Sequence, residues 1–417
     1  MGYMMEFRRM VSSAAILLCL PLALAGGDDY FPPPDSAGGW RTLAGAATIR
    51  KLTGMDIARL DQAFEFEKET SQHGGLLVVR HGYLVYEKYF GKGDREAHPD
   101  MASIGKAFTS ISCGIMLEEM RDRIPEGLET KVFTPKYLPE AFPLNDPLKA
   151  DIKLGQLLTM TSGMHGDGGN PGMVLGEDRP LDPLPRPAAP QDQDASALQT
   201  PMWTTPGGGY SYASASPHVA SIVLRHLTGM EMQQYIEQKL AAPMGFGPWG
   251  YALHRNGNTL PHTPGGGGIA LRSTDAVRFA YLLLHQGRWA NRQLAPAAYV
   301  AMCGRPSPYN PHSPMSLMFE TNADGHVFGA PRDAFFKSGA GGSAIFVVPS
   351  LDLAIYKMSS SDAQLDPQLT GLPVTYQVDR SRDNWKPGPH DQFHDGPVGG
   401  DDGVRRLLEM VVAAVAQ

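Results

Sequence analysis

The chain has 417 residues, with 36 lysines and arginines against 43 aspartates and glutamates, and a formal net charge of −7. Mild acidity without basic clusters does not fit a protein that binds nucleic acid or an anionic membrane surface. The length allows a large core and would often be divided between two domains.

The first residues have the pattern of a secretory signal. Arg8 and Arg9 precede an apolar stretch that ends in Ala23-Leu24-Ala25, before polar residues. This stretch is short for a membrane helix, and no later segment has the ~20 apolar residues that one needs. We therefore predict a signal peptide over residues 1–25, a periplasmic or secreted mature protein, and no stable membrane span.

Two cysteines remain after the predicted signal, Cys113 and Cys303. Two cysteines in an exported chain can form a disulfide. Cys113, however, lies in an apolar helical run, where a free cysteine behaves as a small core residue. We favour free thiols and leave the disulfide open.

The first elements after a Gly/Pro-rich leader are a helix and a hairpin. Residues 55–70 have helical periodicity, with Thr53 or Asp56 as the cap. Two apolar runs, 76–79 and 84–86, then flank His81-Gly82, which predicts a β-hairpin with a two-residue turn.

The middle and the end of the chain differ in character. Residues from about 101 to 303 are mostly helical segments and loops, and the glycine run 265–268 predicts a turn into a helix capped by Ser273. Strand-like segments follow at 315–321, 334–337, 344–348 and 353–358, and a final helix is expected at 404–415. Two segments rich in Pro, Gly and Asp, 167–199 and 364–400, predict long loops or partial disorder.

This order predicts an α+β fold, with one antiparallel sheet flanked by helices, built from both chain ends, and an inserted mainly helical region. We expect one catalytic domain over 26–417. Its α/β part takes about 45–98 and 315–417, and its helical part about 99–314.

The pair Ser103 and Lys106 stands near the start of a long apolar helical run. Positions i and i+3 share one face of a helix, so the lysine amine can reach the serine hydroxyl and take its proton. Ser-x-x-Lys is common by chance, so it carries weight only together with other elements.

Two further elements follow in chain order. Tyr212 and Ser214 lie in Tyr-Ala-Ser after a Pro-Gly-Gly-Gly stretch, and Lys337, Ser338 and Gly339 lie in a strand-like segment. Ser-x-x-Lys, Tyr-x-Asn/Ser and Lys-Thr/Ser-Gly in this order form the pattern of the serine penicillin-recognising enzymes.

The chain therefore resembles the serine β-lactamase-related superfamily, which includes class C β-lactamases, DD-peptidases and family VIII-type esterases. The resemblance runs from about residue 76 to 359 and includes Lys153-Leu154-Gly155-Gln156-Leu157-Leu158-Thr159-Met160-Thr161-Ser162-Gly163-Met164, Thr228-Gly229 and Ala242-Pro243-Met244-Gly245. It implies the β-lactamase/penicillin-binding-protein-like architecture, with the active site between the sheet and the helical region.

The resemblance also implies roles for the matched residues. Ser103 is the nucleophile, Lys106 and Tyr212 are candidate bases, and Tyr210 is the nearest competitor of Tyr212. The backbone N–H groups of Ser103 and Ala340 are the expected oxyanion donors.

The remaining matched residues bear on the substrate. By this resemblance, a lysine at position 337 favours substrates with a carboxylate, since many esterases of the superfamily have His or Trp there. Ser338 and Gly339 are expected to lie along the strand against the substrate. Ser214 stands where the family usually has asparagine, and this departure weakens a β-lactamase assignment.

Other motifs give little support to other chemistry. The chain has no Gly-x-Ser-x-Gly, which argues against the α/β-hydrolase serine enzymes. His390 and His394 lie in a Pro/Gly-rich loop without a third fixed ligand, so we expect neither a metal site nor a cofactor.

We expect an exported serine hydrolase that forms an acyl-enzyme on Ser103 and cleaves an ester or amide bond. Its partner would be a small-molecule or peptide acyl substrate: a β-lactam, a D-amino-acid peptide or a short acyl ester. The alternative is a sensor, binding or assembly member of the superfamily that acylates without turnover, as Ser214 and the unmatched 167–199 segment allow. The sequence leaves the oligomeric state open.

Overall fold

The computed structural model describes residues 30–167, 173–174, 193–255, 258–360, 375–378 and 403–416, so the predicted signal segment and His390 and His394 lie outside the described residues. The helices are α1 Ala46–Thr53, α2 Ile57–Thr70, α3 Gly105–Glu119, α4 Leu154–Leu158, α5 Gln193–Leu198, α6 Ala215–Thr228, α7 Met232–Ile236, α8 Ala242–Met244, α9 Ser273–Leu284, α10 Ala297–Cys303 and α11 Gly403–Ala413. The strands are β1 Gly74–Arg80, β2 Tyr83–Phe90, β3 Met173–Val174, β4 Gly209–Tyr210, β5 Gly250–Arg255, β6 Asn258–Thr259, β7 Ile269–Ala270, β8 Arg288–Trp289, β9 Arg292–Gln293, β10 Met315–Ser316, β11 Phe319–Thr321, β12 Phe335–Ser338, β13 Ala344–Val348, β14 Leu353–Met358 and β15 Thr375–Val378.

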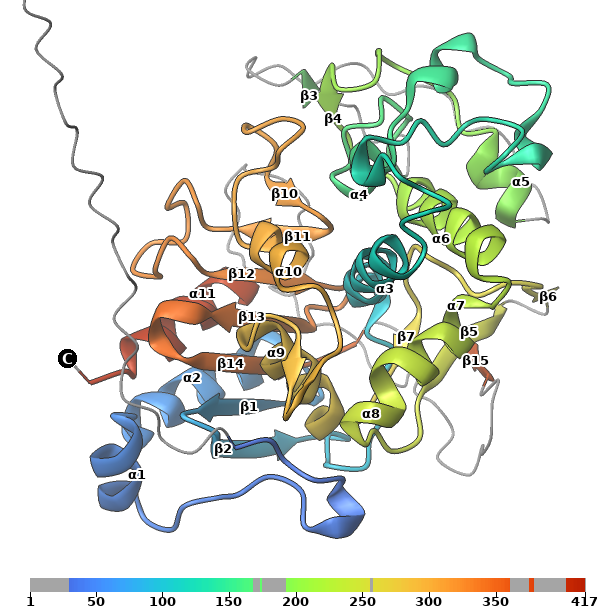
Figure 1. Cartoon of the computed structure of the whole chain (residues 1–417). Coiled ribbons are helices and arrows are strands. Elements are labelled where there is room, and N and C mark those ends of the chain that lie inside the picture. The colour runs from blue at the N-terminus through green and yellow to red at the C-terminus, as the bar shows by residue number, and fades with distance from the viewer. Residues whose placement is uncertain are drawn as a thin grey trace, which may run out of the picture.

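A seven-stranded sheet forms the centre of the molecule, in the order β10-β11-β12-β13-β14-β1-β2 (Figure 1). All neighbouring strands in it are antiparallel. The pairing of β1 with β14 joins the N-terminal hairpin to the C-terminal strands, with Leu77 opposite Tyr356. This confirms the predicted α+β fold with a sheet built from both ends of the chain.

The strands predicted from periodicity are largely present. His81 and Gly82 have φ angles of 51° and 72°, the left-handed conformation of a two-residue hairpin turn. The expected single strand over 315–321 is wrong, because Leu317 and Met318 also have positive φ angles and form a turn between β10 and β11. An apolar run alone does not reveal such a turn.

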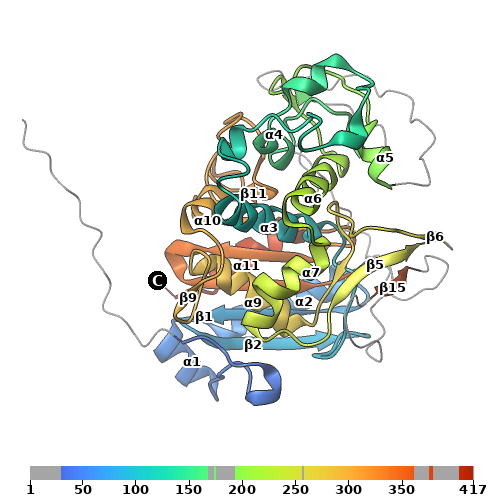
Figure 2. The same cartoon turned by 45° about the vertical axis from the view of Figure 1, so that its right-hand side comes forward.

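Helices cover both faces of the sheet (Figures 1 and 2). α2 and α11 pack on one face, where they share a core with alternate residues of β1, β12 and β13. α3 and α9 cover the other face. Asp56 caps α2 by accepting the backbone N–H groups of Ala58 and Arg59, whereas Thr53 belongs to α1.

The helical region containing α4, α5 and α6 lies beyond α3, on the side away from the sheet (Figure 1). α3 packs against α6, so it is held between the sheet and this region. Residues 105–116 of α3 are all buried. The helix that follows Ser103 is therefore fixed from both sides.

The two segments predicted as long loops contain regular structure where they are described. α5 lies within 167–199, and its Asp194 pairs with His218 and Arg225 of α6. Within 364–400, β15 pairs in parallel with β5. The expectation of loops throughout is therefore wrong for 173–174, where β3 pairs with β4, and for 193–198 and 375–378, since long-range pairing stabilises short elements there.

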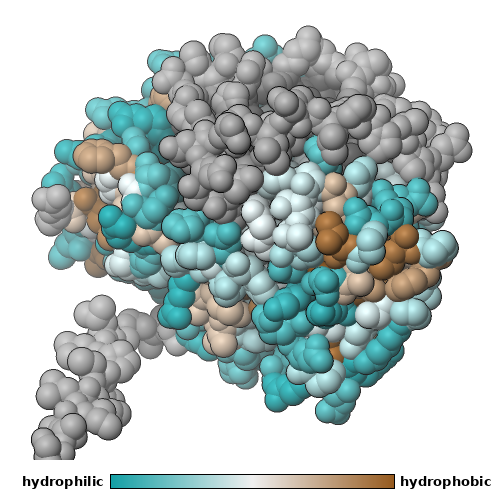
Figure 3. Space-filling view, turned by 90° about the horizontal axis from the view of Figure 1, so that it is seen from above, coloured by the Kyte–Doolittle hydropathy of each residue, from teal (hydrophilic) through white to brown (hydrophobic). Residues whose placement is uncertain are grey.

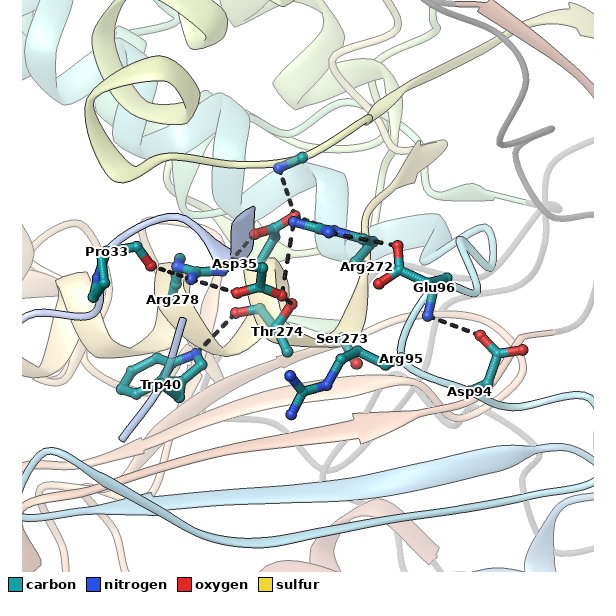
Figure 4. A network of polar contacts seen from close by, with 12 residues as sticks. Pro33, Asp35, Trp40, Asp94, Arg95, Glu96, Arg272, Ser273, Thr274 and Arg278 are labelled. Atoms are coloured by element: carbon teal, nitrogen blue, oxygen red, sulfur yellow. Dashed lines mark hydrogen bonds and ion pairs between the residues drawn. The ribbon is translucent and has the colours of Figure 1, made fainter. Parts of the chain in front are cut away.

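The N-terminal segment is attached to α9 by a buried polar network (Figure 4). Asp35 accepts hydrogen bonds from Arg278 at 2.6 Å and Thr274 at 2.7 Å, and Arg278 also pairs with Asp275 at 2.8 Å. Burial alone would raise the pKa of Asp35, but Arg278 and Thr274 hold it below its ordinary value. This network attaches residues 33–35 to α9.

Large apolar side chains are mostly inside the molecule. Among the described residues, the large hydrophobic side chains that are exposed are Leu52, Phe142, Leu148 and Phe328. Seen from above, the described part of the surface is mainly hydrophilic, with small separate hydrophobic areas (Figure 3). No helix in the described ranges has both the length and the hydropathy of a membrane span.

Both cysteines in the described part of the chain, Cys113 on α3 and Cys303 on α10, are free and buried. Burial raises the pKa of both thiols, that of Cys113 to about 12. The expectation of free thiols therefore agrees with the structure.

A buried ion pair joins α2 to the sheet. Lys357 Nζ of β14 lies 3.0 Å from Glu67 Oε2, and neither side chain is exposed. Removing one member of such a pair leaves an uncompensated charge in the core, which costs more than the pair itself contributes.

We therefore expect Glu67→Gln to lower the free energy of unfolding by about 3–5 kcal/mol in denaturant titration. Asp151→Asn is the control, because its pair with Lys131 has side chains that are 64% and 55% exposed. That change should cost about 0–1 kcal/mol. Equal effects of the two variants would contradict the role of the buried pair.

Candidate active site

Ser103 lies in a tight 3₁₀ turn, Ala102–Ile104, directly before α3. Ala102 has a φ of 45°, and its N–H donates to Asp100 Oδ1 at 2.8 Å. The turn leaves Ser103 half-buried at the positive end of the α3 dipole. A serine in this place is accessible to a substrate while its backbone is fixed.

Lys106 lies in the first turn of α3 and has no exposed surface. Its Nζ is 2.8 Å from Ser103 Oγ and 2.6 Å from the Gly266 carbonyl oxygen. A neutral amine has two N–H groups and one lone pair. An N–H can therefore donate to Gly266 while the lone pair accepts the hydroxyl proton of Ser103.

The glycine run 265–268 forms the wall behind this pair. Gly268 N–H donates to Ala102 O, Met101 N–H donates to Ile269 O, and the Thr109 hydroxyl donates to Gly265 O. A Cβ on Gly267 would lie 2.7 Å from Ala102 O, so only glycine allows this approach.

The glycine run is thus not simply a turn into the next helix, as the sequence suggested, because β7 follows it. The predicted cap of α9 is also wrong. The N-cap position is Arg272, and the Ser273 hydroxyl bonds to the Tyr89 hydroxyl at 2.7 Å instead.

His218 of α6 supports the glycine run from the other side. Gly265 N–H donates to His218 Nδ1 at 3.1 Å, so Nε2 carries the proton that is donated to Asp194 at 2.8 Å. Burial alone would raise the pKa of Asp194, but His218 and Arg225 hold it well below its usual range. A fixed imidazole thus positions the loop that holds Lys106.

Tyr212 lies between β4 and α6 and is 6% exposed. The Lys106 and Lys337 Nζ atoms lie 4.8 Å and 5.4 Å from the centre of its ring. A lysine cation beside a phenol favours negative charge on its oxygen, and Lys337 can supply that charge while Lys106 acts as a neutral amine. Tyr212, rather than Tyr210, is the tyrosine that both lysines flank.

Lys337, Ser338 and Gly339 bring the edge of β12 to the nucleophile turn. A Cβ on Gly339 would lie 2.1 Å from Met101 O and 3.2 Å from Ser103 N. Glycine is required at this contact, and the exposed Ala340 follows it directly. The Gly339–Ala340 peptide therefore starts beside the backbone nitrogen of Ser103.

Ser214 is held by a residue that the sequence did not reveal, Asp167. The Ser214 N–H and hydroxyl donate to the two carboxylate oxygens of Asp167, at 2.8 Å and 2.5 Å. Asp167 N–H donates in turn to Tyr212 O at 2.8 Å. The serine hydroxyl is thus engaged with Asp167, and the carboxylate clamps the Tyr212–Ser214 segment.

Glu320 of β11 is a second residue that sequence reasoning missed. Its Oε1 accepts from Ser338 Oγ at 2.8 Å and lies 3.6 Å from Lys337 Nζ, while Oε2 lies 3.8 Å from Arg405 Nη2. The available signal was a lone charge within an apolar strand-like run, since such residues are rarely buried without a partner. In the described ranges, no three His, Cys, Asp or Glu side chains gather to hold a metal ion.

The structure therefore brings Ser103, Lys106, Tyr212 and Lys337 together, with Ser338, Gly339 and Ala340 along one side. These residues come from the start of α3, the segment before α6, and the end of β12. The Beta-lactamase family model matches residues 61–372, more than half of the chain. The chain belongs to the β-lactamase family. Members of this family are serine hydrolases, among them β-lactamases, esterases and amide hydrolases.

Solved structures with the same fold are distant relatives. A Bacillus anthracis protein proposed to be a 6-aminohexanoate-dimer hydrolase is 19% identical, with a TM-score of 0.57 over 79% of this chain and 84% of that chain. EstCE1, a hydrolase with promiscuous acyltransferase activity, is 16% identical, with a TM-score of 0.56 over 72% and 92%.

A penicillin-binding protein homologue from Caulobacter crescentus is 16% identical, with a TM-score of 0.55 over 86% and 97%. A search of curated protein sequences finds no match. At these identities the likeness shows the fold alone.

The Asp167 clamp leads to a graded prediction for this β-lactamase family member. Asp167→Ala removes both acceptors of Ser214 and should lower kcat for a nitrophenyl ester by about 10- to 100-fold, because hydrogen bonds to a charged group contribute about 1.5–3 kcal/mol. Ser214→Ala keeps the hydrogen bond from the backbone N–H of residue 214 to Asp167, so its kcat should fall less. Steady-state kinetics with melting curves of each variant would test this order, and an unchanged kcat in Asp167→Ala would contradict it.

Proposed function

We propose that the protein is an exported serine hydrolase that cleaves an ester or amide bond through an acyl-enzyme on Ser103. The observation that carries the proposal is the 2.8 Å contact between Lys106 Nζ and Ser103 Oγ, with Lys106 fully buried. A buried amine with a fixed acceptor on one side is suited to take a proton on the other. The signal-like pattern of residues 1–25 supports export.

In the first half of the proposed reaction, Lys106 takes the proton of Ser103, and the serine oxygen attacks the substrate carbonyl carbon. The carbonyl oxygen becomes an oxyanion that accepts the N–H groups of Ser103 and Ala340. As the intermediate collapses, the bond to the leaving group breaks, and the leaving group receives a proton through Tyr212. The products of this half are the acyl-enzyme and the free alcohol or amine.

In the second half, water attacks the ester formed on Ser103. The same lysine and tyrosine take the water proton and return one to the serine oxygen as it leaves, which restores the starting enzyme. The alternative is a member of the family that stops after the first half and acts as a sensor or binding protein. A burst of one equivalent of nitrophenol without further release would favour that alternative.

We expect Ser103→Ala to abolish labelling by a fluorophosphonate probe and to lower turnover of a nitrophenyl ester by roughly three to six orders of magnitude. Ser112→Ala is the matched control on the same helix. Its buried hydroxyl has no hydrogen-bond partner within the described part of the chain, so its loss should leave labelling and turnover in place. Persistent labelling of Ser103→Ala would refute the nucleophile.

A second test addresses proton transfer. Lys106→Met and Tyr212→Phe should each lower kcat by about 100-fold or more, since positioned acid–base groups contribute about 10²–10⁴-fold. The double variant should be little worse than the poorer single one, because the two groups act on the same proton.

Tyr210→Phe serves as the control for removal of a neighbouring phenol and should retain activity. Multiplied losses in the double variant, or a large loss in Tyr210→Phe, would refute the paired role of Lys106 and Tyr212.

A further inference from the structure

Three donors from two elements, β12 and α11, converge on one carboxylate. Ser338 Oγ and Lys337 Nζ of β12 lie 2.8 Å and 3.6 Å from Glu320 Oε1, and Arg405 Nη2 of α11 lies 3.8 Å from Oε2. Two cations and a hydroxyl around two oxygens form a site suited to a carboxylate. In this chain the carboxylate comes from the protein itself.

Glu320 is connected to the catalytic cluster through Lys337 and Ser338. Lys337 Nζ lies 5.4 Å from the centre of the Tyr212 ring, and Gly339 contacts the nucleophile turn one residue after Ser338. The Glu320 carboxylate therefore adjoins the end of β12 that lies against the nucleophile turn.

We propose that Glu320 is a specificity-determining residue that fills the carboxylate-binding position of the site from within. The substrates would then be esters or amides whose acyl part has no carboxylate at this position. The proposal rests on the hydrolase function proposed above, and it deepens that function by naming the substrate class.

Two physical terms act against a second carboxylate. A substrate carboxylate close to Glu320 meets a like charge in a region where water screens weakly. To take the Ser338 and Lys337 contacts, it must also displace a glutamate side chain that is only 14% exposed. A neutral acyl group is not repelled by Glu320 and does not have to displace its side chain.

Local structure keeps Glu320 in place. Its backbone is held in the β11–β12 pairing, opposite Phe336, so the side chain and Ser338 share one face of the sheet. Arg405 holds the second oxygen from α11, a helix that packs on α2 over that face. The carboxylate is thus fixed from two elements that do not take part in the chemistry.

The contacts of Lys337 differ from those expected from its motif. A lysine in this motif suggests recognition of a substrate carboxylate, but here the lysine is already beside Glu320. Its charge remains available to the Tyr212 phenol and the oxyanion. The preference for acyl groups without a carboxylate is therefore set by Glu320 of β11 rather than by the Lys337-Ser338-Gly339 motif.

The experiment uses two esters that differ only at the far end of the acyl chain: 4-nitrophenyl butyrate, which ends in a methyl group, and mono-4-nitrophenyl succinate, which ends in a carboxylate. The full mature chain should favour the butyrate by about tenfold or more in kcat/KM. Glu320→Gln should narrow that ratio by about tenfold, mainly through a lower KM for the succinate ester. These factors follow from the ~10- to 100-fold that one charge-assisted contact contributes.

Two variants serve as controls. Asp324→Asn removes a charge that is 73% exposed in the turn after β11, and it should leave the ratio at the wild-type value. Glu320→Asp keeps the charge and should keep the preference for the butyrate. Should Glu320→Gln fail to fold, Glu320→Gln with Arg405→Gln removes one charge of each sign and should narrow the ratio in the same way.

The outcomes separate the two proposals. A wild-type chain that cleaves neither ester and resists the fluorophosphonate would refute the hydrolase function. A wild-type chain that cleaves both esters equally, or a ratio unchanged in Glu320→Gln, would refute the specificity role while leaving the hydrolase function standing. In the latter case Glu320 is a counter-ion for the buried Lys337 and the partly exposed Arg405, and Glu320→Gln loses thermal stability alone.

Discussion

The burial of the Lys106 amine is the constraint on which the rest of the site depends. A lysine nitrogen removed from water must find partners inside the protein, or its charged and neutral forms both become costly. Here Ser103 Oγ and Gly266 O provide them at hydrogen-bonding distance. The carbonyl of Gly266 can reach Lys106 only because Gly267 permits contact with the nucleophile turn. The conformation of the glycine run thus determines the orientation of the Lys106 amine.

The nucleophile turn connects the sheet and the helical region through backbone contacts. The nucleophile turn contacts the end of β12 through Gly339 and the glycine run through Gly267, while α3 continues between the sheet and α6. His218 of α6 fixes the glycine run from the helical side. Movement of either half against the other would shift Gly266 and Gly339 relative to the Ser103–Lys106 pair, so the rigidity of the interface is a condition for chemistry.

The sequence predicts the parts of this protein that depend on short-range patterns. The hairpin at His81-Gly82, the bounds of β13 and β14 and the order of the three motifs follow from local residues. The engagement of Ser214 by Asp167 and of Ser338 by Glu320 could not be predicted, because each pairs residues from elements whose approach only the fold determines. The cap of α9 failed for the same reason, since Tyr89 of β2 takes the Ser273 hydroxyl.

The placement of Cys113 has a practical consequence. Its thiol lies on α3 against the Ala220 carbonyl of α6, without exposure and with a pKa raised to about 12. A thiol-reactive reagent needs both access and a thiolate, and the closed structure provides neither. The alkylation rate of this natural cysteine would therefore report how often α3 and α6 separate, as amide hydrogen exchange does for a backbone group. The chain thus contains an intrinsic probe of opening in the helix that positions its nucleophile.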